Sequence, residues 1–405
     1  MPESLLIVAG ESSGELYGSL LAAELGRMAP GVKIFGVGGE KMEAAGVELI
    51  RRVSGAFGIT ELLSHLMDLR ATFREVIRKI EDERPQCAVL IDFPDFNFRA
   101  AAELKKRGVP VLYYVSPQLW AWRAGRIKKM KELADRVALI LPFEQEIYRK
   151  AGIPHEFVGH PALDEIRASM TGMMPDSEKA SGMMPLSQTD MKPSGMMPEQ
   201  IKADLVLDKT KPLLALLPGS RPSELKKHLP LFHDVLGIFR REFPDWQFFM
   251  PLAPNLETGP FSAQFRTFRE EGVAVKKQNA LMALAASDAA LIASGTATFQ
   301  AALLGKPFTV VYKLSPLTFR LAKLLVKVKY VSLVNILSGG QVVREFLQND
   351  ANPGNVMAEL REIVGNPGYR EQMAARFKTV REMFTGKCAS RRVAEMVCEM
   401  AGWGR

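Results

Sequence analysis

The stretch LLALLPGSRPSE at residues 213–224 constrains the fold more than any other part of this chain. Five apolar residues lead into the tetrapeptide PGSR at 218–221, and Pro222 follows where a helix would take its first turn. A buried strand, a turn of small residues and a helix that begins with proline predict a strand–loop–helix unit. Similar alternation recurs along both halves of the chain, which is typical of an α/β fold with parallel sheets.

The start of this predicted helix has the features of an anion site. Its first backbone N–H groups have no partner inside the helix, and the helix dipole places partial positive charge there. Gly219 lets an anion approach the backbone, Ser220 adds a hydroxyl, and Arg221 adds a two-pronged donor suited to phosphate. We therefore expect a diphosphate-binding loop. An ordinary turn with a surface arginine is the alternative.

Length and composition bound the kind of protein. The 405 residues are enough for two domains, and 47% hydrophobic with 24% charged residues is an ordinary soluble composition. Apolar runs fall short of the ~20 residues that span a bilayer, so no transmembrane helix is expected. The first apolar run lacks a preceding basic region, which favours a first strand over a signal peptide.

Charge and metal-binding residue types narrow the partners. The net charge of +8 favours an anionic partner, such as a nucleotide or an acidic membrane surface. Three scattered cysteines and five unpaired histidines predict neither disulfides nor a metal site, and no cofactor is expected. Together with the missing signal, the cysteines indicate the cytoplasm. His160 is expected to cap or pack rather than to catalyse.

A second strand–loop–helix unit opens the chain. Leu5–Ala9 reads as a strand and residues 15–28 as a helix, separated by the loop Gly10-Glu11-Ser12-Ser13-Gly14. The glycines do not match the dinucleotide fingerprint G-x-G-x-x-G. Glu11 is the unusual member of the loop. It either caps the turn or faces a sugar hydroxyl or a reacting group.

A strand at residues 86–91 ends in two carboxylates, Asp92 and Asp95. Catalytic residues of parallel sheets lie at such strand ends, and a general base must reach a substrate hydroxyl. Asp95 is the candidate base, whereas Asp92 could hold the loop by accepting backbone N–H bonds. That both are turn residues is the alternative.

Several stretches could contact a membrane. A helix predicted over residues 59–80 carries more apolar residues at its start than one stripe needs: Ile59, Leu62, Leu63, Leu66 and Met67. This surplus could dock to a bilayer or an acyl chain, or be buried on two sides. A tryptophan-rich loop at 116–123 could stack on a sugar face or rest among lipid headgroups, and a basic, apolar helix at 316–328 could lie on an anionic bilayer.

The second half contains a further small-residue turn. Ser294, Gly295 and Thr296 follow a strand at 289–293 and open a helix, so they are expected to bind a phosphate or ribose, with Gln300 within reach of the ribose. Between the halves, the repeated tetrapeptide GMMP marks residues 168–200 as a low-complexity insertion.

These observations predict an α/β fold of two domains with doubly wound parallel sheets. The first domain is expected at residues 1–165 and the second at 205–375. Residues 166–204 are expected to be a linker with the Met-rich insertion, and 376–405 to be C-terminal helices that could pack back on the first domain.

A series of motifs resembles one family of enzymes. In chain order they are AGESSGE at 9–15, IDFPDFN at 91–97, YVSPQLWAWR at 114–123, LPFE at 141–144, FVGHP at 157–161, LPGSR at 217–221, ASGTAT at 293–298 and YVSLVN at 330–335. The series is similar to the lipid-A-disaccharide synthases, which are glycosyltransferases of the GT-B type. It covers almost the whole chain except residues 168–200. The resemblance implies two facing Rossmann-like domains with a deep cleft between them, the second of which binds the UDP-sugar.

The resemblance implies transfer of diacylglucosamine from UDP-2,3-diacylglucosamine to the 6-hydroxyl of 2,3-diacylglucosamine 1-phosphate. Enzymes of this family invert the anomeric centre, need no metal and act at the cytoplasmic face of the inner membrane. The implied partners are therefore these two lipids and, peripherally, the anionic membrane surface. Homo-oligomerisation remains open.

The family's site residues carry over by motif. Asp95 matches the proposed base and Glu11 the first-loop glutamate near the reacting sugar, with Ser12, Ser13 and Gly14 as substrate contacts beside it. Gly219, Ser220 and Arg221 match the diphosphate loop, and Ser294 to Thr296 with Asn335 match nucleotide-side positions. Gln300 stands where the family usually has glutamate, Val334 replaces a usual proline, and Glu15 a usual aspartate.

Two other functions compete with this one. The first is another UDP-sugar enzyme of the same fold, such as a UDP-N-acetylglucosamine epimerase, which would not need the apolar surplus at 59–67. The second is a membrane-binding adaptor without catalytic activity. Nucleic-acid binding is not expected, because basic strand faces with interleaved aromatic residues are missing.

Overall fold

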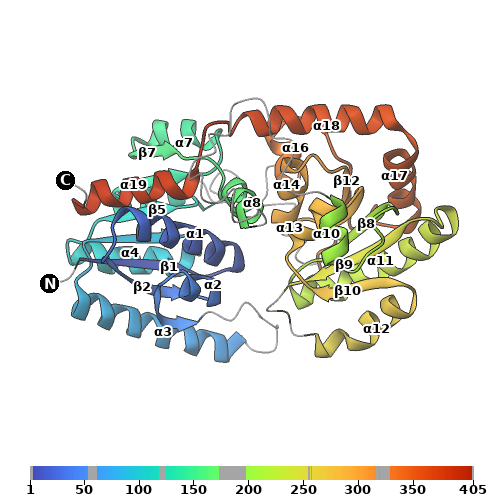
Figure 1. Cartoon of the computed structure of the whole chain (residues 1–405). Helices are drawn as coiled ribbons and strands as arrows, with labels where there is room; N and C mark the ends of the chain where they lie inside the picture. The colour runs from blue at the N-terminus through green and yellow to red at the C-terminus, as the bar shows by residue number, and fades with distance from the viewer. Residues whose placement is uncertain are drawn as a thin grey trace. The chain divides into compact units, whose positions relative to one another are not determined.

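A computed structural model describes residues 3–52, 62–117, 125–172, 198–253, 256, 258–315, 319 and 329–403. The chain divides into two compact units, one of Met1–Glu165 with Gly386–Arg405 and the other of Ile166–Thr385. Each unit has its own parallel sheet flanked by helices (Figure 1). This confirms the predicted α/β class with two Rossmann-like, doubly wound domains.

Unit 1 contains a seven-stranded sheet in the order β3-β2-β1-β4-β5-β6-β7. Its strands are β1 (Ser4–Ala9), β2 (Lys33–Gly38), β3 (Glu48–Arg52), β4 (Cys87–Ile91), β5 (Val111–Tyr114), β6 (Arg136–Leu139) and β7 (His155–Phe157). Its helices are α1 (Ser12–Met28), α2 (Glu40–Ala44), α3 (Leu62–Glu83), α4 (Pro94–Lys106), α6 (Arg126–Leu133), α7 (Glu144–Ala151) and α19 (Ala389–Ala401). Helix α8 (Pro161–Gly172) begins in this unit.

Strand β1 shows how the sequence places the core of unit 1. All six of its residues are buried, because helices cover both faces of the sheet. Leu6 and Val8 join a core cluster with residues of α3 and α4, such as Val76. Since neighbouring side chains of a strand point to opposite faces, Leu5 and Ile7 face the other side. Helices α1 and α19 pack against each other in this unit (Figure 1).

Unit 2 contains a six-stranded sheet in the order β10-β9-β8-β11-β12-β13. Its strands are β8 (Leu213–Leu217), β9 (Gln247–Leu252), β10 (Val273–Lys277), β11 (Ala289–Ala293), β12 (Phe308–Tyr312) and β13 (Glu345–Leu347). Its helices are α10 (Pro198–Asp204), α11 (Pro222–Glu242), α12 (Ser262–Glu270), α13 (Ala280–Ala286), α14 (Thr296–Leu303), α16 (Leu333–Leu337), α17 (Pro353–Gly365) and α18 (Pro367–Glu382). Aromatic rings join the sheet to its helices: Phe308 of β12 stacks on Phe377 of α18.

The chain passes between the units twice, after Glu165 and after Thr385. Beside both passages, the buried carboxylate of Asp164 accepts hydrogen bonds from Ser390, at 2.7 Å from the backbone N–H and 3.0 Å from the hydroxyl. This side chain therefore ties the start of α19 to the start of α8 within unit 1.

The structure adds elements that the sequence pattern did not predict. The edge strands β3, β7 and β13 are short and partly exposed, so they lack the apolar run that marks the central strands. Helix α4 begins at Pro94, in a stretch where no helix was predicted. Helices α8 and α10 extend into the expected linker 166–204, and residues 173–197 lie outside the described part.

None of the helices in the described part of the chain combines the length and the apolar character that crossing a membrane requires.

Candidate active site

The predicted nucleotide loops lie at one place in unit 2. The order of its sheet reverses between the neighbouring strands β8 and β11. Open parallel sheets bind ligands at the carboxyl ends of the strands at such a switch point. Gly219, Ser220 and Arg221 follow β8, and Ser294 to Thr296 follow β11. The fold therefore brings both stretches to adjacent strand ends.

The loop after β8 differs from the sequence expectation in one respect. The carboxylate of Glu224, in the first turn of α11, accepts hydrogen bonds from the backbone N–H groups of Ser220 (3.0 Å) and Arg221 (3.2 Å). Two donors that were expected to be unpaired are thus satisfied inside the protein. Gly219 has φ +122°, and a Cβ there would lie 2.6 Å from Glu224. The R-x-x-E spacing of a capping box was the sequence signal for this contact.

The loop after β11 keeps more of its expected character. Gly295 precedes α14 with extended backbone, and Gly295 and Thr296 are exposed. The carbonyl of Gly295 accepts hydrogen bonds from the backbone N–H and the hydroxyl of Thr298. The first N–H groups of a helix have no intrahelical partner, so the start of α14 presents donors at this sheet edge. Gln300 is buried on α14, one turn further along.

The side chain of Asn335, which was expected on the nucleotide side of the site, is engaged in hydrogen bonds within unit 2. Its side chain is fully buried, and its Nδ2 donates to the Val343 carbonyl (2.8 Å) and to Glu345 (2.7 Å). Its Oδ1 accepts from the N–H groups of Val342 (2.7 Å) and Val343 (3.0 Å). A carboxamide makes four hydrogen bonds at most, so this side chain has none left for a ligand. In this conformation it holds residues 342–345 in place.

Unit 1 has its own switch point, between the neighbouring strands β1 and β4. Glu11 follows β1 and is exposed, whereas Asp92 follows β4 and is half-buried. The two loops pack on each other, because a Cβ on Gly10 would lie 2.2 Å from the ring of Phe93. The predicted acidic residues of the first domain therefore follow adjacent strands.

The turn after β4 is strained and firmly held. Asp92 and Phe93 both have φ +47°, a left-handed conformation that costs energy for residues other than glycine. The carbonyl of Asp92 accepts hydrogen bonds from Asn97 Nδ2 (2.7 Å) and from the Tyr113 hydroxyl (2.9 Å). Asn97 and Tyr113, which the sequence analysis did not single out for this task, thus fix the path of the chain ahead of Asp95.

Asp95 lies in the first turn of α4, and its side chain is 77% exposed. One carboxylate oxygen accepts a hydrogen bond of 2.6 Å from the guanidinium of Arg126, at the start of α6. Arg126 also lies over the ring of Phe98, 5.7 Å from its centroid. Asp95 can therefore reach solvent or a substrate, and Arg126 orients its carboxylate.

The remaining residues of the first loop start α1. Ser13 is half-buried, and Gly14 is buried against Ala9 and Ile91. The Ser12 side chain lies outside the described residues. Glu15 accepts the backbone N–H of Lys41 at 2.9 Å and so caps the start of α2.

The predicted membrane surface falls largely outside the described part of the chain. Ile59 is outside it, and Leu62, Leu63, Leu66 and Met67 belong to α3 without described side chains. Most of the tryptophan loop at 116–123 and of the basic stretch 316–328 is likewise outside. These expectations stay predictions.

His160 has the capping and packing role that the sequence predicted. Its Nδ1 accepts the N–H of Ala162 at 3.1 Å, which caps the start of α8. The ring is buried and meets Tyr17 edge-on, with the centroids 6.2 Å apart. Burial lowers the pKa of His160 to about 3, so the imidazole is neutral in the folded protein.

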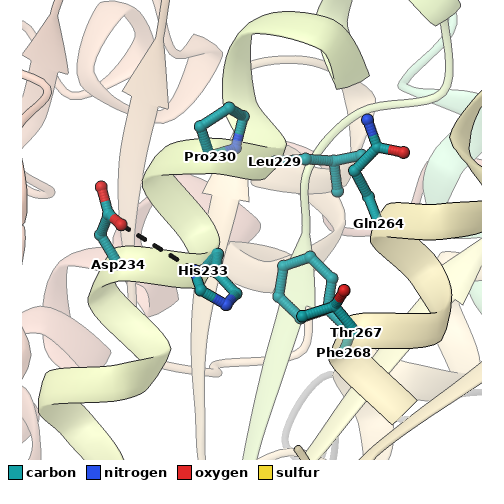
Figure 2. A pocket seen from close by; sticks show the side chains of 7 residues that line it. All are labelled: Leu229, Pro230, His233, Asp234, Gln264, Thr267 and Phe268. Atoms are coloured by element: carbon teal, nitrogen blue, oxygen red, sulfur yellow. Dashed lines mark ion pairs between the residues drawn. The ribbon is translucent and has the colours of Figure 1, made fainter. Parts of the chain in front are cut away.

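A surface pocket of about 290 Å³ lies between α11 and α12 of unit 2. Figure 2 shows the residues that line it: Leu229, Pro230, His233, Asp234, Gln264, Thr267 and Phe268. His233 lies 2.8 Å from a carboxylate oxygen of Glu271. The lining contains none of the residues predicted to act on a sugar nucleotide, so this pocket is not the candidate active site.

Two Rossmann-like units with parallel sheets are the architecture of the GT-B fold, which many two-domain glycosyltransferases have. Solved structures agree. UDP-GlcNAc 2-epimerase from Neisseria meningitidis bound to UDP-GlcNAc matches with a TM-score of 0.65 at 14% identity, covering 98% of this chain and 100% of that one. The glycotransferase of kitacinnamycin matches with a TM-score of 0.57 at 16% identity, covering 98% and 99%. At such identities the likeness shows the fold alone.

The family model of lipid-A-disaccharide synthetase matches residues 5–179 and 185–397. Lipid-A-disaccharide synthase of Anaeromyxobacter dehalogenans is 38% identical over 402 residues, covering 98% of this chain and 97% of the relative. The enzyme of Myxococcus xanthus is 36% identical over 407 residues, covering 100% and 99%. This chain belongs to the lipid-A-disaccharide synthase family.

The chain is therefore a glycosyltransferase that forms the lipid A disaccharide. The alternative of an epimerase is not favoured, since that likeness is one of fold only. This agrees with the family resemblance of the sequence motifs.

Proposed function

We propose that unit 2 binds the UDP-sugar donor and that unit 1 supplies the base for the acceptor hydroxyl. One observation carries this proposal. Each sheet has a switch point, and the carboxylates follow the strands of one while Arg221 and the small-residue loops follow the strands of the other. The Neisseria meningitidis epimerase, which shares the fold, was solved with UDP-GlcNAc bound.

The proposed base is Asp95, with Asp92 as the alternative. The 6-hydroxyl oxygen attacks the anomeric carbon, its proton passes to the Asp95 carboxylate, and the bond from that carbon to the UDP phosphate oxygen breaks with inversion. Exposure supports Asp95, because a base must reach its substrate. Asp92 lies in the strained turn, where its backbone carbonyl accepts hydrogen bonds from the side chains of Asn97 and Tyr113.

The negative charge that develops on the leaving UDP needs fixed donors. Arg221 and the start of α14, with Ser294, Gly295 and Thr296, are the proposed source. Gly219 lets the phosphates approach, and Gln300 is the proposed ribose contact. Glu11, with Ser12 to Gly14, is proposed to contact the reacting sugar.

We also propose peripheral association with an anionic membrane surface, because both substrates carry acyl chains. The net charge of +8, the basic stretch 316–328 and the apolar start of α3 support this. Co-sedimentation with vesicles that contain anionic lipid tests it. Equal recovery with neutral and anionic vesicles would contradict the electrostatic part.

The decisive experiment measures disaccharide formation and UDP affinity in matched variants. Asp95→Asn should lose transfer by at least about 100-fold while UDP affinity stays the same, as expected for a general base. Arg221→Ala should weaken UDP binding by about tenfold or more. Asp92→Asn is the matched control for the base. If Asp92→Asn abolishes transfer and Asp95→Asn does not, the roles are exchanged.

A further inference from the structure

His228 joins two loops at the carboxyl edge of the sheet in unit 2. It lies on α11 and is fully buried. Its Nδ1 is 2.9 Å from the carbonyl oxygen of Pro218, the residue before Gly219. Its Nε2 is 3.0 Å from the backbone nitrogen of Lys313, which follows β12. One ring therefore bridges the loop after β8 and the loop after β12.

The partners fix the state of the ring. Because the Pro218 carbonyl can only accept a hydrogen bond, Nδ1 must carry the proton. Because the Lys313 backbone N–H can only donate, Nε2 must be unprotonated. Burial lowers the pKa of His228, which favours this neutral form. The imidazole is therefore both a donor and an acceptor, and an aliphatic or aromatic side chain could not make these two bonds.

Glu224 and His228 lie one turn apart on α11, which places them on the same face of the helix. The first holds the N–H groups of Ser220 and Arg221, and the second holds the carbonyl of Pro218. Helix α11 thus binds both N–H groups and a carbonyl of the loop that precedes it. Through Lys313, His228 also links this loop to the end of β12, which lies two strands from β8 in the sheet.

We infer that His228 is a positioning residue for donor binding: it sets the loop that carries Arg221 against the loop after β12. This inference rests on the proposed function of Arg221. It predicts that the loss of His228 weakens donor binding through that loop, whereas the chemistry at the sugar, supplied by unit 1, is left unchanged.

The test compares steady-state kinetics of disaccharide formation by the full chain in five variants. His228→Phe keeps a ring but loses both hydrogen bonds. Its KM for the UDP-sugar should rise about tenfold, as expected from loss of about 1.4 kcal/mol of binding, with kcat within about twofold of the parent. His228→Asn, whose amide can still reach the Pro218 carbonyl, should recover part of the affinity. His233→Phe, on the same helix but facing the pocket of Figure 2, is the matched control and should leave KM unchanged.

The fourth variant is Arg221→Ala, and the fifth combines it with His228→Phe. If His228 acts through this loop, the fold-increase in KM of the double variant should be well below the product of the fold-increases of the two single variants. Full additivity, or an unchanged KM in a folded His228→Phe protein, would overturn the inference. Thermal unfolding checks that each variant is folded, and His228→Asn provides the comparison if the phenylalanine variant is not. An unchanged KM in Arg221→Ala alone would instead refute the donor site.

Discussion

The buried histidine at the start of α8 gives a stability prediction with a defined size. His160 is neutral in the folded protein because burial lowers its pKa from 6.5 to about 3. In the unfolded chain it would bind a proton near its ordinary pKa. The unfolded state therefore holds more protons below pH ~6.5, and acid must destabilise unit 1. The stability supplied by the neutral ring is complete above pH ~6.5 and is lost as the pH falls toward the folded value.

The magnitude follows from the two pKa values. At about pH 4.5, two units below the unfolded pKa, protonation of the unfolded chain at this histidine lowers the free energy of unfolding by about 2.7 kcal/mol, at 1.36 kcal/mol per pH unit. Carboxylates also titrate in this range, so a single protein cannot isolate the effect. The perturbation is therefore His160→Asn, because asparagine is a good helix cap and its oxygen can replace Nδ1 as acceptor of the Ala162 N–H.

The assay is amide hydrogen exchange of peptides from β1 and β4, which reports the unfolding free energy of unit 1 alone. Between about pH 7.5 and 4.5, the parent should lose about 2.7 kcal/mol more than His160→Asn. His233→Asn, at a half-exposed position of unit 2, is the control and should follow the parent. If parent and His160→Asn lose the same stability within about 0.5 kcal/mol, His160 is not buried as a neutral ring and the reasoning fails.

Two further predictions use contacts of unit 1. Gly10→Ala should lower both activity and the unfolding temperature, because its Cβ would lie 2.2 Å from the Phe93 ring, whereas Gly26→Ala on α1 has open space and should stabilise the helix by about 0.5–1 kcal/mol. Thermal unfolding measures both, and equal effects would contradict the packing of the two loops. Asp164→Ala should cost about 1–3 kcal/mol and should expose α19 to proteolysis first, because Ser390 loses its acceptor. Uniform cleavage along the chain would contradict that local role.

The sequence predicted the central strands and their loops because these depend on local patterns. Apolar runs such as that of β8 and the following proline and glycine need no distant partner to be recognised. Chain order and small-residue turns also sufficed to select Glu11, Asp95 and Arg221, although the sheet order was needed to place them beside the switch points.

Side-chain partners were harder to predict, because they depend on residues brought together only by folding. Asn335 sits in a recognisable motif, yet its donors and acceptors are taken by residues 342–345. His228 was not singled out at all, since Lys313 is 85 positions away. Glu224 was not singled out either, although its position three residues after Arg221 is the local spacing of a helix cap.

The return of α19 to unit 1 has a consequence for how the protein is made. A ribosome releases the chain from the N-terminus, so residues 1–165 emerge long before α19 does. Unit 1 therefore stays incomplete, with the side of α1 that α19 covers exposed to water, until unit 2 has been translated. Although most of unit 1 is synthesised first, it is completed last, and nascent chains stalled before residue 386 should be bound by chaperones.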